Sequence, residues 1–127
     1  MKILSVDTTT SICSVAIRID GVLIFDVFLN IKNSHSENLL EMIKFALCKS
    51  NLELSQIDYF GISKGPGSYT GLRIGFSTMY GICFALKKKL IGVDTLESMI
   101  FDVKKNIRDK DNFDLIAMID AKKERVY

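Results

Sequence analysis

The chain has 127 residues, of which 48% are hydrophobic and 25% are charged, and its formal net charge is +2. This length corresponds to one domain, or to one lobe of a larger protein, and it is sufficient to bury a core. The composition is ordinary for a soluble globular protein, and so small a net charge does not by itself indicate nucleic-acid binding.

The start of the chain is predicted to form an antiparallel meander of strands. Lys2–Asp7 reads as an apolar strand that ends in a hydroxyl-rich turn of threonines and a serine. Ile12–Ile19 alternates between apolar and polar residues, as a half-buried strand does. Asp20-Gly21 is a strong hairpin signal, and Val22–Leu29 supplies the returning strand.

The rest of the chain alternates helices with strands. Apolar residues at helical spacing indicate a helix over Glu37–Cys48, with Ser34 or Ser36 as its N-cap. A strand over Ile57–Ser63 follows, and a glycine-rich run then leads into a long helix over Thr70–Leu86. The remaining predicted elements are a strand over Leu90–Val93, a helix over Leu96–Lys105, a strand over Leu115–Asp120 and the start of a new element over 121–127. This order predicts an α/β fold in which a mixed five-stranded sheet carries helices on its faces.

The glycine-rich run Lys64–Gly75 lies where α/β proteins usually hold ligands. A Walker loop would need glycine at position 70 and lysine at position 71, and the chain has Thr70 and Gly71 there. Two interpretations stay open. The loop binds an anion, or Pro66-Gly67 makes a tight turn and the hydroxyl of Ser68 or Thr70 caps the helix. The candidate anion contacts in the run are Gly67, Ser68, Thr70 and Arg73.

Two carboxylates at strand ends and one histidine are the other candidate chemical groups. Asp7 is followed by three threonines, so Asp7 and Thr9 could hold a cation or a water molecule near a phosphate. Asp120 ends a later strand in the same way, although aspartate at a strand end is also a common turn former. His35 is the chain's only histidine, which is too few for a metal site of the usual type, and it is interpreted as part of a helix start.

The helix over Thr70–Leu86 is apolar nearly all round. Small residues recur at a spacing of four, which predicts a groove that lets another backbone come close. A helix of this character must be buried on both sides. One side is expected to cover the sheet, and the other meets either a partner or neighbouring helices of the same domain. The small residues are Gly71 and Gly75, and then Ser77, Gly81 and Ala85.

Cysteine usage and hydropathy bear on the cellular compartment. Cys13, Cys48 and Cys83 are widely spaced and form no CxxC pair, which predicts free thiols in a reducing compartment rather than a disulfide framework or a zinc site. No signal-peptide pattern precedes the first strand, and the most apolar stretch is too short to span a bilayer. We therefore expect a cytoplasmic location without membrane association.

Five segments, taken together, resemble the bacterial TsaB (YeaZ) family, the partner subunit in making threonylcarbamoyladenosine in tRNA. They are KILSVDTTTSICSVAI, HSENLLEMI, KGPGSYTGLRIG, IGVDTLESM and AMIDAKKERVY, and they cover essentially the whole chain. The resemblance implies an actin-like, Hsp70-like and sugar-kinase-like (ASKHA, ribonuclease H-like) fold, in which two lobes flank a cleft. Residues 1–113 would form the first lobe, and residues 114–127 would start the second.

The resemblance also implies a non-catalytic role. The catalytic paralogue TsaD carries a His-x-x-x-His metal pair, and the equivalent positions here are Thr95 and Met99, which are not ligands for such a metal. The chain is therefore expected to bind and activate a TsaD-like transferase, with no catalytic residue and no metal of its own. No cofactor is expected for this chain, and ATP or ADP with Mg²⁺ would enter only in the assembled complex.

The partners that the resemblance implies are the TsaD-like subunit, as a heterodimer, and the ATPase subunit of the same pathway, with tRNA contacted only indirectly. A homodimer would use the same helices, 36–50 and 70–86, in a four-helix interface. The expected partner-binding residues are Leu39, Ile43, Leu72, Gly75, Phe76, Met79, Gly81 and Ile82.

Two other functions stay open at this point. A kinase-like nucleotide-binding or ATPase domain would use the Asp7 turn and the glycine-rich loop. A tRNA-binding module would show a steep salt dependence of RNA binding, but the small net charge makes it the least favoured of the three.

Overall fold

The computed structural model describes residues 1–30, 35–106, 114–122 and 124–127. Its main body is a five-stranded sheet with the strand order β3-β2-β1-β4-β5. The strands are β1 (Lys2–Asp7), β2 (Ile12–Ile19), β3 (Val22–Asn30), β4 (Tyr59–Ser63) and β5 (Lys89–Val93). The helices are α1 (His35–Lys49), α2 (Tyr69–Leu86) and α3 (Thr95–Asn106), and a short 3₁₀ turn covers Leu54–Gln56.

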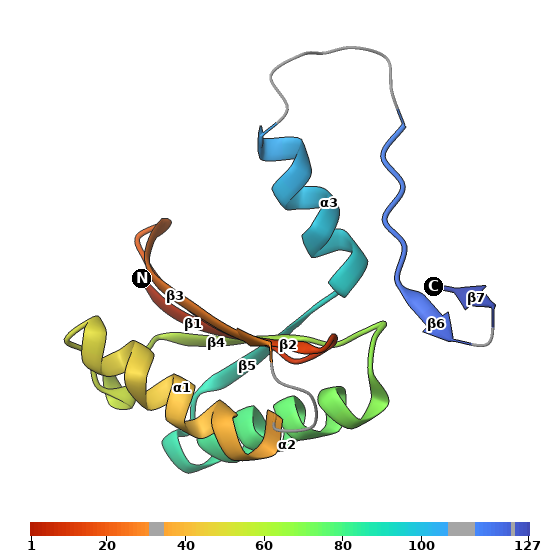
Figure 1. Ribbon diagram of the computed structural model, residues 1–127. Helices are drawn as coiled ribbons and strands as arrows, with labels where there is room; N and C mark the ends of the chain where they lie inside the picture. The colour runs from red at the N-terminus through yellow and green to blue at the C-terminus, as the bar shows by residue number, and fades with distance from the viewer. Residues whose placement is uncertain (31–34, 107–113, 123) are drawn as a thin grey trace.

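The sheet is mixed, as the sequence predicts. β2 pairs antiparallel with β1 and with β3, whereas β4 pairs parallel with β1 and with β5. The parallel pairs require crossovers, and α1 and α2 supply them. Figure 1 shows α1 and α2 together on one face of the sheet and α3 on the other. The carboxyl ends of β1 and β4 therefore lie side by side, close to the start of α2.

The hairpin predicted at Asp20-Gly21 is confirmed. Both residues have positive φ, 50° and 83°. A two-residue hairpin turn favours central residues that can adopt positive φ, as aspartate and glycine do. β2 follows the predicted alternation, with Cys13, Val15 and Ile17 buried on the side that faces α1. The hairpin and the alternation together fix the register of the meander.

The core lies between the sheet and the pair formed by α1 and α2. Because residues three and four apart share one face of a helix, α1 places a single apolar stripe against the sheet. Met79 and Cys83 complete the core from α2. The largest fully buried side chains from the strands and α1 include Leu4, Ile17, Leu39, Ile43 and Phe60.

Some predicted boundaries differ from the structure. β4 begins at Tyr59 rather than at Ile57, because Leu54–Gln56 forms a 3₁₀ turn just before it. The strand predicted over Leu115–Asp120 is wrong for most of its length: residues 114–119 carry no strand, and β6 (Asp120–Lys122) pairs with β7 (Arg125–Val126) in a separate two-stranded sheet. Apolar alternation alone cannot make a strand, which needs a neighbour for its backbone hydrogen bonds. The predicted cap Ser34 lies outside the described residues, as does the side chain of Ser36.

Within the described part of the chain, no helix is both long and apolar enough to cross a membrane. The described residues also contain no cluster of three or more metal-ligating side chains of the His, Cys, Asp or Glu type. His35 is the first residue of α1, and its side chain lies outside the description. All three cysteines are free thiols, as predicted.

We expect the three thiols to react at very different rates. Burial raises the pKa of the Cys13 thiol, and the charge of Asp7 raises it further. Burial likewise raises the pKa of Cys83, whereas Cys48 is exposed on α1. At mildly alkaline pH a thiol-specific chromogenic reagent should therefore label one equivalent quickly in the native protein, and three equivalents in denaturant. Rapid labelling of all three in the native protein would contradict the described core.

Candidate functional site

The glycine-rich loop meets the threonine turn after β1 through direct backbone contacts. The Ser68 amide donates a hydrogen bond to the carbonyl oxygen of Thr9, at 2.7 Å. The Thr8 hydroxyl donates to the carbonyl oxygen of Gly71, also at 2.7 Å. Both threonines are buried, with exposed fractions of 1% each. The first turn of α2 is therefore docked on the residues that follow β1, more than 60 positions earlier in the chain.

Glycine is required where the helix and the turn meet. A Cβ atom added at Gly71 would overlap the carbonyl oxygen of Thr8, and one added at Gly75 would overlap the Thr8 hydroxyl. At Gly67 an added Cβ atom would lie against the backbone and Cβ of Thr9. The three glycines allow the backbone of α2 and its loop to approach the turn more closely than any other residue would.

The carboxylate of Asp7 stabilises the threonine turn through hydrogen bonds. One carboxylate oxygen, Oδ1, accepts hydrogen bonds from both the amide and the hydroxyl of Thr9, each at 2.7 Å. The other, Oδ2, accepts from the hydroxyl of Ser63, the last residue of β4, at 2.9 Å. The carboxylate therefore joins the ends of two neighbouring parallel strands and closes the threonine turn at the same time.

The structure brings together four of the six predicted anion contacts. Asp7, Thr9, Gly67 and Ser68 lie in the same small network, and Ser68 is the N-cap of α2, accepting from the Gly71 amide at 3.3 Å. The cap confirms one of the two hydroxyls that the sequence offered. The other two residues, Thr70 and Arg73, are exposed, and the Arg73 guanidinium lies over the Tyr69 ring at 5.5 Å.

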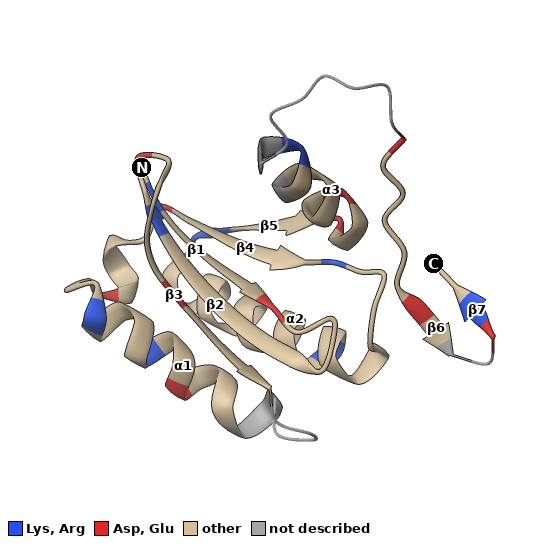
Figure 2. Ribbon diagram, turned by 45° about the horizontal axis from the view of Figure 1, so that its top comes forward, with Lys and Arg blue, Asp and Glu red and all other residues tan. Residues whose placement is uncertain are grey.

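The flank of α2 on the side of β5 is exposed and aromatic. Phe76 and Tyr80 stack with centroids 5.7 Å apart, and Tyr80 and Phe84 stack at 6.2 Å. These three residues, which we call the aromatic stripe, are 55%, 54% and 75% exposed. Between Arg73 and Lys87 the helix carries no charged residue. By contrast, the ribbon in Figure 2 shows charged residues of both signs along α1. An exposed aromatic surface such as that of α2 is unusual on a soluble domain.

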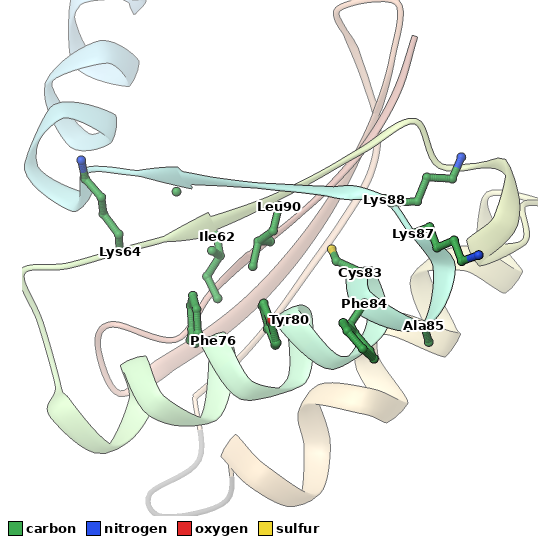
Figure 3. Close-up of a pocket in the computed structure, with 11 residues that line it drawn as sticks. Ile62, Lys64, Phe76, Tyr80, Cys83, Phe84, Ala85, Lys87, Lys88 and Leu90 are labelled. Carbon is green, nitrogen blue, oxygen red and sulfur yellow. The ribbon is translucent and has the colours of Figure 1, made fainter.

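An open hollow of about 860 Å³ lies between the aromatic stripe and the edge strand β5. Figure 3 shows Phe76 and Tyr80 lying along α2 beneath Ile62 and Leu90 of the sheet. Lys64, Lys87 and Lys88 stand at its margins. The helix ends beside this hollow at Lys87, whose left-handed backbone conformation (φ 55°) closes the last turn.

Half of the predicted partner-binding residues pack inside this chain. Leu39, Ile43 and Met79 are core residues with exposed fractions of 0–1%. Another backbone does come close at Gly71 and Gly75, as their spacing predicts, but it is the threonine turn of the same chain, so Gly75 is not on the exposed surface of α2. Leu72 and Ile82 are half-buried. The remaining two members of the predicted set, Phe76 and Gly81, are exposed.

The expected partner-binding residues left out several exposed apolar residues of the two helices, among them Leu40 on α1 and Tyr80 and Phe84 on α2. A signal for two of them was present, because Phe76, Tyr80 and Phe84 recur at a spacing of four and therefore share one face of α2. The apolar composition of a helix does not by itself determine which of its faces the sheet covers. The positions of Gly71 and Gly75 decide it here, because they face the threonine turn.

The sheet order and the helices on both of its faces define the class of protein. This is one lobe of the actin-like, Hsp70-like and sugar-kinase-like (ASKHA) fold, as predicted. Solved structures share this fold. "YeaZ from Pseudomonas aeruginosa" superposes with a TM-score of 0.85 at 27% identity, over 98% of this chain and 57% of that one. A further structure, described as "Crystal structure of an uncharacterized protein with similarity to peptidase YEAZ from Pseudomonas aeruginosa", superposes with a TM-score of 0.78 at 30% identity, over 83% of this chain and 48% of that one.

The model of the family "TsaD: tRNA N6-adenosine threonylcarbamoyltransferase" matches residues 27–127. The "tRNA threonylcarbamoyladenosine biosynthesis protein TsaB" of Escherichia coli is 34% identical over 128 residues, covering 100% of this chain and 53% of that protein. The protein of the same description from Buchnera aphidicola of Acyrthosiphon pisum is 35% identical, over 98% and 55%. The chain belongs to this family and is a TsaB (YeaZ) member of it. It spans about half the length of the curated relatives that it matches.

Matched glycine substitutions test the docking of α2. Gly71→Ala should lower the free energy of unfolding by roughly 1–3 kcal/mol, because the new methyl group has no room beside the Thr8 carbonyl. Gly81→Ala is the control in the same helix, since nothing lies within 4 Å of an added Cβ atom there. It should raise the free energy of unfolding by about 0.5–1 kcal/mol, because alanine favours a helix more than glycine does. Urea denaturation measures both, and equal effects would contradict the described packing.

Proposed function

We propose that the chain acts as a non-catalytic subunit that binds and activates a TsaD-like transferase in the threonylcarbamoyladenosine modification of tRNA. The observation that carries the proposal is the uncharged, exposed aromatic stripe on α2 of a TsaB family member. A monomeric soluble domain rarely exposes several large apolar side chains in a row, and such patches mark interaction sites.

The arrangement of the two helices suits a helical partner. α1 and α2 lie beside each other on one face of the sheet (Figure 1). Phe45 of α1 packs edge-on against Phe25 of β3, at 5.8 Å, so that side of α1 faces away from α2. Leu40, which is 48% exposed, lies on the opposite side of the helix. Leu40, Gly81 and the aromatic stripe together would form one half of a four-helix interface.

A second copy of the chain would use the same surface, so we propose that a homodimer and the heterodimer compete. We also propose that the ATPase subunit of the pathway joins the complex, that tRNA is contacted only indirectly, and that the chain works in the cytoplasm. Residues 114–127 would begin the second lobe, a proposal supported by the separate β6–β7 sheet.

We propose no cofactor for this chain alone, and ATP or ADP with Mg²⁺ only in the assembled complex. The alternative, a kinase-like nucleotide-binding domain, has less support from the site. Such a domain would use the Asp7 carboxylate toward a cation, and three hydrogen-bond donors of this chain already occupy its oxygens. The loop amide of Ser68 is likewise engaged with Thr9 rather than directed at a ligand.

Removing one ring of the aromatic stripe should weaken the complex. Phe84→Ala is expected to raise the dissociation constant for the TsaD-like protein by about 10- to 100-fold, because buried aromatic residues dominate the energetics of interfaces. Calorimetric titration of the two proteins measures this change. Phe28→Ala is the matched control, because Phe28 is 71% exposed but lies on β3, away from α2.

Gly81→Leu probes the same surface by adding bulk. The position is exposed and open, so the variant should fold while its side chain keeps a partner helix away. We expect it to abolish co-elution with the TsaD-like protein. Normal complex formation by folded Phe84→Ala and Gly81→Leu variants would overturn the assignment of this surface.

A further inference from the structure

We propose that Asp7 is a positioning residue, whose carboxylate fixes the threonine turn on which the first turn of α2 rests and thereby sets where the aromatic stripe lies. The positioning itself is a property of this chain alone. Only its consequence for a partner rests on the proposed function.

The first step runs from the carboxylate to the turn. Asp7 Oδ1 accepts hydrogen bonds from the amide and the hydroxyl of Thr9. Asp7 Oδ2 accepts one from the hydroxyl of Ser63, at the end of β4. Hydrogen bonds to a charged acceptor are stronger than those between neutral groups. The conformation of the turn therefore depends on one charged group that is itself anchored to two neighbouring strands.

The second step runs from the turn to the helix. The carbonyl oxygen of Thr9 accepts a hydrogen bond from the Ser68 amide, and the Thr8 hydroxyl donates a hydrogen bond to the carbonyl oxygen of Gly71. Gly71 and Gly75 have no side chains to separate the two backbones. Every one of these contacts involves a main-chain atom of α2 or of its cap, so moving the turn must move the helix backbone.

The length of α2 carries a change at its first turn to the aromatic stripe. About 15 residues separate the first turn of α2 from Phe84, which at 1.5 Å per residue is a lever of roughly 22 Å. A tilt of about 10° at the first turn would displace Phe84 by roughly 4 Å. A shift of that size changes how the aromatic stripe meets another surface. The geometry thus connects a half-buried carboxylate at one end of α2 with a recognition surface at the other.

Native-state hydrogen exchange of Asp7→Asn tests this inference. We expect the amides of Ser68, Gly71 and Leu72, which lie at the cap and first turn of α2, to exchange at least about tenfold faster in the variant. The Lys88 amide, bonded to the carbonyl oxygen of Cys83 at the other end of the helix, should keep its rate. Ser63→Ala removes one donor only, and it should give a smaller change at the same amides.

Asp58→Asn is the matched control. Asp58 precedes β4, and its Oδ2 accepts the Lys2 amide at 2.7 Å, so the variant removes a second carboxylate that joins the same two strands at their opposite end. It should leave the Ser68 and Gly71 amides unchanged. Unchanged exchange at the start of α2 in both Asp7→Asn and Ser63→Ala would overturn the positioning role. A uniform acceleration at all slow amides would also overturn it, because that pattern indicates a general loss of stability.

Titration of the same variants with the TsaD-like protein separates the two proposals. Selective exchange at the start of α2 together with at least about tenfold weaker binding by Asp7→Asn, but not by Asp58→Asn, supports the link between positioning and recognition. Selective exchange with unchanged binding would overturn that link and leave the positioning intact. If the unaltered protein itself does not bind, the proposed function fails, and the exchange result still decides the role of Asp7.

Discussion

The structure depends on one close approach, the contact of the start of α2 with the threonine turn after β1. Carbonyl and hydroxyl oxygens of Thr8 occupy the space where Gly71 and Gly75 would otherwise carry side chains. Hydrogen bonds from both partners hold the approach together. Because this contact decides which side of α2 faces inward, it also decides which side remains exposed. The aromatic stripe is the consequence.

Most of the fold could be predicted from local patterns. The alternation of Ile12–Ile19, the Asp20-Gly21 turn and the apolar spacing of α1 each depend on neighbours in sequence, and all three were confirmed. The orientation of α2 could not be predicted in this way. Small residues lie on two sides of this helix, and only the position of Thr8, more than 60 residues away, selects Gly71 and Gly75 as the inward pair.

The glycine-rich loop shows how similar residues can serve a different purpose. Glycines between a strand and a helix commonly let a phosphate approach the backbone. Here the approaching group is another part of the same chain, and the amide of Ser68 binds the carbonyl oxygen of Thr9. The near miss to the Walker loop agrees with this arrangement, since a loop that packs on its own fold needs the small residues but not the lysine.

We propose above all that this lobe presents α2 to a TsaD-like partner. Size-exclusion chromatography with light scattering of the unaltered protein, alone and mixed with that partner, tests it most directly. We expect a new species in the mixture, whose mass is that of one partner molecule plus one copy of this 14.3 kDa chain. Two separate peaks with unchanged masses, at concentrations well above those expected for a specific complex, would contradict it.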